Sequence, residues 1–230
     1  MDSKVLLTKI YGFLLDKYGP QGWWPLLEYE GSNPTKTGSL KNYHPGDYSY
    51  PKNDRQRLEI CVGAILVQST AWSNVEKALL NIREMVEFDH ESLLGTEEEK
   101  LKQAIRPAGY YNQKAKTLLA FSEFYASLEG KTPSREELLG IRGIGKETAD
   151  SILLYAFGQS TFIVDAYARR IFGNLGLIDA NVPYDKIKRF FEENLEPDVA
   201  LFQEYHALLV EHGKRFYSGD GNECPLKALL

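Results

Sequence analysis

The sequence predicts an all-α fold, and three observations lead to this expectation. Apolar residues recur at the three- and four-residue spacing of helices along most of the 230-residue chain. No region shows several alternating strands joined by hairpin turns. The apolar fraction of 43% and the charged fraction of 26% are those of an ordinary globular protein. The chain is therefore long and apolar enough for one large helical domain or two small ones.

The predicted helices follow one another from the N-terminus. Apolar stripes at helical spacing cover residues 6–14, 58–67, 75–85 and 115–125, and further helices are expected over 146–157, 165–175, 184–194 and 198–217. The second stripe ends in the polar run Gln68–Thr70, which is typical of a helix that leads into a functional turn. Residues 31–53 lack this periodicity and are rich in turn-forming residues. We expect a solvated loop there, with a flap beside a ligand as the alternative.

Composition limits the environments and partners of the chain. Two cysteines and four histidines argue against a disulfide framework and against a structural zinc site. No apolar run is long enough to span a bilayer, and the N-terminus shows no secretory signal pattern, so we expect no membrane partner. The net charge of −5 weighs against a nucleic-acid partner. It does not exclude one, because a local basic face or backbone N–H groups can hold phosphates.

The segment 138–150 carries the most specific pattern in the chain. Gly143 and Gly145 are separated by one residue, flanked by apolar residues and followed at once by a predicted helix. Two such glycines permit a tight turn with unusual dihedral angles. The turn would present backbone N–H groups at the start of the helix, where a phosphate binds without any reading of bases. A simple corner between two helices is the alternative interpretation.

An aspartate follows this hairpin. Asp165 lies 18 residues after Glu147 (165 − 147) and directly after an apolar run that ends at Val164. It precedes a predicted helix, so its structural role is that of an N-cap. The functional interpretation is catalytic, with the carboxylate directed into a cleft.

The hairpin and the aspartate at this spacing resemble those of the helix-hairpin-helix DNA glycosylase superfamily, to which endonuclease III belongs. The resemblance covers roughly residues 56–217, including the segment 63–70. It implies that Asp165 is catalytic and that Gln68 fills the gap that a flipped base leaves in the duplex. The residues that it implies in DNA binding are Gln68, Gly143, Gly145, Lys146 and Thr148.

Two departures from the superfamily pattern refine the expected activity. Bifunctional members carry a lysine nucleophile that forms a Schiff base, and Glu147 stands at that position. The neighbouring Lys146 points about 100° away around the helix, which favours a monofunctional enzyme without AP-lyase activity. Many relatives hold an iron–sulfur cluster with four cysteines near the C-terminus, where this chain has Cys224 alone. We therefore expect no iron–sulfur cluster and no metal site.

A branch of relatives that lacks the cluster removes 3-methyladenine, and this chain resembles that branch further. Its segments Gly22–Pro25 and 106–116 are close to the branch pattern. The base pocket that the resemblance implies consists of Trp23, Trp24, Pro25, Trp72 and Glu59. Core packing is the alternative for the tryptophans, and Glu59 fits equally well as the cap of a neighbouring helix.

The lysines give weaker signals. Lys114, Lys116 and Lys146 suit phosphate contacts or solvated helix faces. Lys214 shares a helix face with apolar residues, so snorkelling to solvent is its structural interpretation. The alternative is that Lys214 helps to pin the C-terminal tail, as a modified, carbamylated side chain.

Together these features imply a base-excision mechanism. Flipping a base costs a few kcal/mol, stacking on tryptophan offsets this cost, and Asp165 stabilises the cationic sugar and directs water. An alkylated purine is itself cationic, so it stacks well on aromatic rings and leaves without a strong acid. We therefore expect monofunctional removal of alkylated purines such as 3-methyladenine. The alternatives are a glycosylase for oxidised or mismatched bases, with or without lyase activity, and a non-catalytic helix-hairpin-helix DNA-binding protein.

The resemblance also implies two helical domains with a DNA-binding cleft between them. Residues 1–55 and 162–230 would form one domain from both termini. Residues 56–161 would form an inserted helical barrel that carries the hairpin motif at about 138–156. We expect a monomer that binds double-stranded DNA containing a damaged base, in the cytoplasm or, in a prokaryote, the nucleoid. We expect no cofactor, except that a monovalent cation fits at the hairpin.

Overall fold

The predicted all-α fold is confirmed. The computed structural model describes residues 2–36, 39–179, 181–217 and 224–230. Within these residues the strand-like pairing is limited to one isolated bridge between Ser32 and Lys41, and no helix is long and apolar enough to cross a membrane. The elements in chain order are α1 Ser3–Tyr18, α2 Asp54–Leu66, α3 Trp72–Met85, α4 His90–Leu94, α5 Glu98–Ala104, η1 Arg106–Ala108, α6 Tyr111–Ser127, α7 Arg135–Gly140, α8 Lys146–Ser151, η2 Ile152–Ala156, α9 Ala166–Asn174, α10 Tyr184–Asn194, α11 Val199–Phe216 and η3 Pro225–Leu229.

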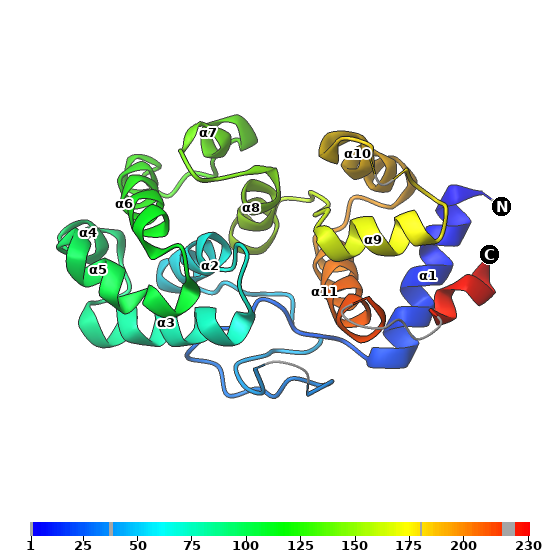
Figure 1. The fold of residues 1–230 in the computed structure, drawn as a ribbon, viewed down its shortest axis with the longest axis horizontal. Helices are drawn as coiled ribbons and strands as arrows, with labels where there is room; N and C mark the ends of the chain where they lie inside the picture. The colour runs from blue at the N-terminus through cyan, green and yellow to red at the C-terminus, as the bar shows by residue number, and fades with distance from the viewer. Residues whose placement is uncertain (1, 37–38, 180, 218–223) are drawn as a thin grey trace.

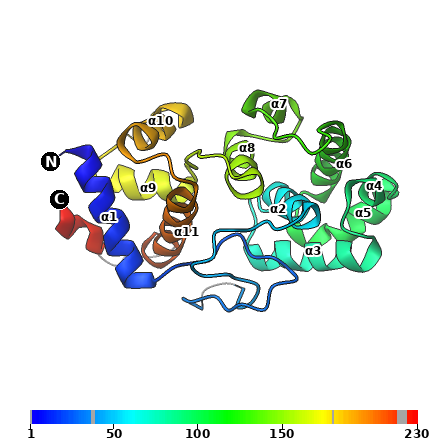
Figure 2. The same cartoon turned by 180° about the vertical axis from the view of Figure 1, so that it is seen from behind.

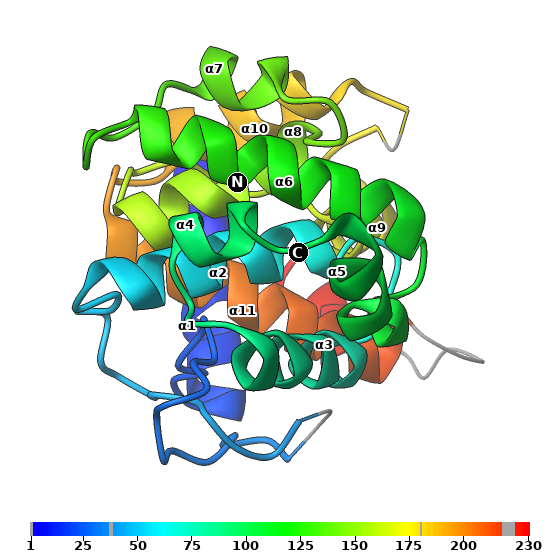
Figure 3. The ribbon, with the colours of Figure 1, turned by 90° about the vertical axis from the view of Figure 1, so that its left-hand side faces the viewer.

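The helices form two groups that lie side by side (Figure 1). Helices α2 to α8 make one group, and α1, α9, α10, α11 and η3 make the other, with both chain ends at its far side. The view from behind shows the same separation (Figure 2), and the end-on view shows α6 and α3 on either side of α2 (Figure 3). The division into 1–55 plus 162–230 and 56–161 stays a prediction.

Capping residues determine where several helices begin. Asn53 caps α2 by accepting the N–H of Gln56, so this helix begins before the apolar stripe that predicted it. The expected helix over 146–157 is not one continuous α-helix, because its second half, η2, has π-helical geometry. The N–H of Gln159 bonds to the carbonyl oxygen of Leu153 at 2.9 Å, six residues back, and this wide closure ends the element.

The segment 31–53 is an irregular loop with many exposed residues, as expected, but part of it packs against the rest of the protein. Tyr43 and His44 are each 2% exposed. One ring nitrogen of His44 lies 2.8 Å from the carbonyl oxygen of Trp24. The Tyr48 hydroxyl donates to a carboxylate oxygen of Glu204 on α11 at 2.7 Å. In both face views the chain between α1 and α2 runs along the lower side of the molecule (Figures 1 and 2). The contact of His44 holds the later part of this chain against residues 23–24 in its earlier part.

Candidate active site

A cavity of about 400 Å³ lies between the two helix groups. One side of its lining comes from the segment 23–24, from the turn after α2 and from the starts of α3 and α8. The other side comes from the residues that open α9 and from α11. The lining brings together these residues predicted from the sequence: Trp23, Trp24, Trp72, Asp165 and Lys214.

The three tryptophans form an aromatic wall of this cavity. The ring centroid of Trp72 lies 5.9 Å from that of Trp23 and 5.3 Å from that of Trp24. The plane of the Trp72 ring is inclined to those of Trp23 and Trp24 by 48° and 85°, so the rings pack edge to face or tilted. The role of the three tryptophans in holding a base stays a prediction. Trp24 and Trp72 are 3% and 8% exposed, so they are core residues as well.

Asp165 is both a helix cap and a cavity residue. Its Oδ1 accepts the N–H of Ala168 at 2.7 Å, which caps α9. The side chain is 8% exposed, and this burial raises its pKa to about 6. Hydrogen bonds from the backbone and the charges of Arg170 and Lys214 act in the opposite direction. The N-cap interpretation of Asp165 is confirmed, and its catalytic role stays a prediction.

Glu147 places a second carboxyl group in this cavity. Loss of solvent around the group and the charge of Asp165 raise the pKa of Glu147 to about 7. Both carboxyl groups in the cavity therefore bind their protons more tightly than free carboxyl groups do. The neighbouring Lys146 lies outside the cavity, and its Nζ is 2.5 Å from Oδ2 of Asp185. Lys146 and Glu147 diverge as helical geometry predicts.

Lys214 lies inside the cavity. Its Nζ is 5.8 Å from the centroid of the Trp23 ring. Burial lowers the pKa of Lys214, against the opposing charges of Glu211 and Asp165. Lys214 is partly exposed and lines the cavity, and its proposed modification stays a prediction.

His212 contacts the described part of the C-terminal tail. One of its ring nitrogens, Nδ1, lies 2.8 Å from the Tyr18 hydroxyl. The other, Nε2, lies 3.2 Å from Sγ of Cys224. This chain of contacts links α1, α11 and the residue that precedes η3.

Two predicted pocket residues lie outside the cavity lining, Pro25 and Glu59. A carboxylate oxygen of Glu59 accepts the N–H of Leu27 at 2.7 Å, and burial raises the pKa of Glu59 to about 7. Glu59 thus holds the chain just after the tryptophan segment. This contact fixes the backbone at Leu27, and the predicted pocket role of Glu59 gains no support from the cavity lining.

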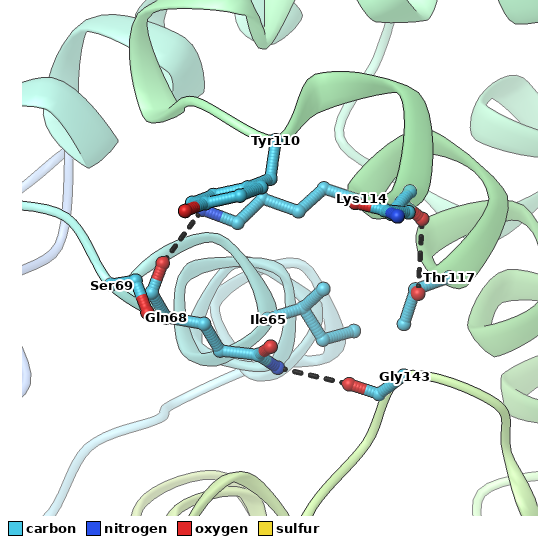
Figure 4. A pocket seen from close by; sticks show the side chains of 8 residues that line it. Ile65, Gln68, Ser69, Tyr110, Lys114, Thr117 and Gly143 are labelled. Atoms are coloured by element: carbon cyan, nitrogen blue, oxygen red, sulfur yellow. Dashed lines mark hydrogen bonds between the residues drawn. The ribbon is translucent and has the colours of Figure 1, made fainter.

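Gln68 lies beside the hairpin, at the edge of a second hollow (Figure 4). Its Nε2 donates to the carbonyl oxygen of Gly143 at 3.1 Å and to Oγ1 of Thr148 at 3.0 Å. The structure thus brings Gln68, Gly143 and Thr148 together, although they come from distant parts of the sequence.

The two hairpin glycines differ in their backbone geometry. Gly143 has a φ of +97°, and a Cβ atom there would collide with the side chain of Thr117. Gly145 has a φ of −92°, and nothing lies within 4 Å of a Cβ built there. The expectation that both glycines serve an unusual turn is therefore wrong for Gly145. The open space above Gly145 is available to a ligand from outside the chain.

Lys114 is neither a phosphate contact nor part of a solvated face. It is 5% exposed, and its Nζ donates to the carbonyl oxygens of Leu66, Gln68 and Ala108 at 2.8, 2.9 and 2.8 Å. Burial lowers the pKa of Lys114 to about 8. The ammonium group ties the turn that carries Gln68 to the start of α6. Lys116, two residues on, is exposed as expected.

The sequence-based prediction missed two residues. His206 is 6% exposed and lines the cavity, and its position one helical turn before Val210 was the available signal. Tyr110 is 68% exposed, has a φ of +47° and lies across the second hollow from Gln68 (Figure 4). No periodicity in the sequence marks Tyr110, because it stands in the turn before α6.

Comparisons with known proteins show the family of this chain. The sequence model of the HhH-GPD superfamily of base excision DNA repair proteins matches residues 62–197. A candidate DNA repair glycosylase of Methanocaldococcus jannaschii is 41% identical, over 96% of this chain and 94% of that protein. Endonuclease III of Thermotoga maritima is 28% identical, over 77% of this chain and 85% of its own length.

Solved structures show the same fold. The crystal structure of a Helicobacter pylori 3-methyladenine DNA glycosylase bound to 1,N6-ethenoadenine has a TM-score of 0.68 and 26% identity, covering 93% of this chain and 98% of that one. An endonuclease III–DNA complex has a TM-score of 0.74 at 18% identity and covers 100% and 95%, a likeness of fold. The chain belongs to the HhH-GPD superfamily of base excision DNA repair proteins.

Proposed function

We propose that this DNA repair glycosylase is monofunctional and removes alkylated purines such as 3-methyladenine from double-stranded DNA. The cavity that joins the tryptophan wall to Asp165 and Glu147 carries the proposal. Aromatic faces attract a cationic base, and an ionised carboxylate stabilises the cationic sugar. The similarity to a glycosylase named for 3-methyladenine supports the choice of substrate.

The proposed reaction is hydrolysis of the N-glycosidic bond. The bond breaks with its electron pair going to the purine nitrogen, which neutralises the cationic base. Asp165 is ionised above about pH 6, so its carboxylate stabilises the cationic sugar and accepts a proton from the attacking water. The water oxygen then forms the new bond to the sugar carbon. The reaction needs no cofactor, and a monovalent cation at the hairpin stays a prediction.

Lys214 supports a second candidate activity. A lysine with a lowered pKa in the cavity can supply a neutral amine, which attacks the sugar carbon in place of water while the N-glycosidic bond breaks and the base leaves. The sugar ring then opens at the bond between this carbon and the ring oxygen, which takes up a proton from the nitrogen, and a Schiff base remains. That step would add AP-lyase activity. Glu147 at the position of the lysine nucleophile favours the monofunctional mechanism.

Carbamylation of Lys214 is a further part of the proposal. A neutral amine adds carbon dioxide and releases a proton, which leaves an anionic carbamate. The change would replace a cation beside Trp23 by an anion, and a cationic base would no longer be repelled. Protein in ¹³C-labelled bicarbonate should then give a carbamate carbon signal, and Lys214→Met should lose it.

A lesion panel tests the proposed function. Duplexes containing 3-methyladenine, 7-methylguanine, thymine glycol or 8-oxoguanine would be incubated in parallel, and the released bases measured. We expect release of the methylated purines and none of the oxidised bases. Release of oxidised bases without 3-methyladenine would contradict the substrate, whereas release of none would contradict the activity.

Borohydride trapping on the same duplexes separates the two mechanisms. A monofunctional enzyme forms no Schiff base and gives no trapped complex. A trapped complex that Lys214→Ala removes would establish the second candidate instead. Lys146→Ala is the matched control, because Lys146 lies outside the cavity.

A further inference from the structure

The hydrogen bond between Tyr155 and His206 determines which ring nitrogen of this cavity histidine carries the proton. The Tyr155 hydroxyl lies 3.0 Å from the carbonyl oxygen of Gln203 and 2.8 Å from Nδ1 of His206. A carbonyl oxygen only accepts, so the hydroxyl donates to Gln203 and accepts from an Nδ1–H of His206. With the proton on Nε2 instead, the Tyr155 hydroxyl could donate either to Nδ1 or to the Gln203 carbonyl oxygen, but not to both. One of the two hydrogen bonds would be lost, and two lone pairs would face each other at that contact. Nδ1 therefore carries the proton, and Nε2 carries a lone pair.

The Nε2 atom of His206 is open to the cavity. His206 lines the cavity, and its Nδ1 edge is turned toward Tyr155. Nε2 has no hydrogen-bond partner among the described residues, yet it is not sealed from solvent, unlike Nε1 of Trp24 and Trp72. The centroid of the His206 ring lies 6.1 Å from that of Trp23, and the two rings are nearly perpendicular, so His206 lies beside the aromatic wall.

The surroundings keep this imidazole neutral. Burial lowers the pKa of His206 to about 3, so it holds no second proton at physiological pH. A neutral ring does not repel a cationic base. Of the groups that line the cavity near it, tryptophan nitrogens donate hydrogen bonds only, and Lys214 also only donates when charged. His206 thus adds an uncharged acceptor to the aromatic side of the cavity.

We infer that His206 Nε2 is a specificity-determining acceptor that receives a hydrogen bond from the exocyclic amino group of a flipped adenine-type base. The inference rests on the proposed function and narrows it to 6-aminopurines. Alkylation makes the purine cationic, which strengthens its amino group as a donor. A base without that amino group leaves Nε2 unpaired and loses this part of its binding.

Two substitutions at His206 separate this role from simple packing. In His206→Asn, the amide reaches the Nδ1 position, so the bond to Tyr155 is kept and the acceptor at Nε2 is lost. In His206→Gln, the amide oxygen reaches the Nε2 position, so the acceptor is restored and the bond to Tyr155 is lost. Tyr155→Phe, which frees the tautomer, is a third variant.

The test uses the free bases 3-methyladenine and 3-methylpurine, which differ in the 6-amino group alone, as inhibitors of 3-methyladenine release from methylated duplex DNA. We expect His206→Asn to weaken inhibition by 3-methyladenine roughly tenfold and to leave 3-methylpurine unchanged. His206→Gln should keep the preference for 3-methyladenine, and Tyr155→Phe should reduce it.

The outcomes are distinguishable. Equal inhibition of the unchanged protein by 3-methyladenine and 3-methylpurine would overturn the acceptor role alone. The same conclusion would follow if His206→Asn kept the preference for 3-methyladenine and His206→Gln lost it. A protein that releases no 3-methyladenine from methylated DNA overturns the proposed substrate, and the inference with it. Thermal midpoints of the variants show whether each protein is folded.

Discussion

At the scale of single residues, the tryptophans of the cavity divide between stacking and core packing. Trp23 is half-buried, whereas Trp72 is 8% exposed and touches both other rings. Trp23→Ala should lower the rate at limiting substrate tenfold to a hundredfold, because base stacking contributes about 1–3 kcal/mol. The loss should be largest for 3-methyladenine in a base-release assay.

Trp72→Ala serves as the contrast to this substitution. It empties a core position, so it should lower the free energy of unfolding by about 3–5 kcal/mol. Denaturant unfolding measures this loss. A Trp72→Ala protein as stable as the parent, or a Trp23→Ala protein of unchanged activity, would contradict this division.

Glu147 should make stability depend on pH. Its pKa in the folded protein, about 7, is above its ordinary value of 4.5, so the folded state binds more protons than the unfolded state between these values. The contribution of Glu147 to stability is therefore highest below pH 4.5 and falls as the pH rises to about 7. Glu147→Gln removes this loss. Its thermal midpoint should match the parent at pH 4 and exceed it at pH 8, and the reverse order would refute the assignment.

At the scale of elements, Lys114 holds the turn that carries Gln68. Lys114→Met keeps the apolar stem but leaves the carbonyl oxygens of Leu66, Gln68 and Ala108 without their donor. At about 1–3 kcal/mol for each unpaired group, unfolding free energy should fall by roughly 3 kcal/mol or more. Binding to abasic-site duplex should weaken as well. Lys116→Met, on the exposed side of α6, is the control and should change neither quantity beyond a surface effect.

The hairpin offers a matched pair of glycines for separating folding from binding. Gly143→Val forces a positive φ on a β-branched residue and a collision with Thr117, so it should destabilise the protein by about 2 kcal/mol or more. Gly145→Val meets no atom of the chain. It should leave the thermal midpoint nearly unchanged and weaken binding to all duplexes alike, because a backbone contact to phosphate carries no sequence information. Selective loss for one base sequence would contradict a backbone contact.

At the scale of the whole molecule, one buried carboxylate joins the cavity wall to the second helix group. Glu204 on α11 accepts the N–H of Gln21 at 2.7 Å and the Tyr48 hydroxyl at 2.7 Å. It thereby holds both ends of the segment that carries Trp23 and Trp24. The wall and the acids are consequently fixed to one another across the two groups.

Hydrophobic periodicity predicted the helices of this fold better than the burial of the segments that connect them. Residues 184–194 were predicted to their observed bounds, since a strongly amphipathic helix has a clear stripe. The packed part of segment 31–53 could not be predicted, because its burial depends on contacts such as that of His44 with the carbonyl oxygen of Trp24. Local sequence carries no signal for such distant partners.

The candidate site shows the same limit. Asp165 could be placed because a capping position and the spacing from the hairpin coincide. Lys114 could have been recognised as buried from its spacing to Leu118, one turn on, but its three carbonyl partners come from two other parts of the chain. The tautomer of His206 depends in the same way on Tyr155, which lies 51 residues away.

The central claim is that Asp165, facing the tryptophan wall, hydrolyses the bond to an alkylated purine. Single-turnover release of 3-methyladenine by the parent protein and by Asp165→Asn tests it most directly. The asparagine variant should fold, because asparagine caps a helix as well as aspartate, and should bind abasic-site duplex. Its release rate should fall at least about a hundredfold. A folded Asp165→Asn protein that releases 3-methyladenine at nearly the parent rate would contradict the claim.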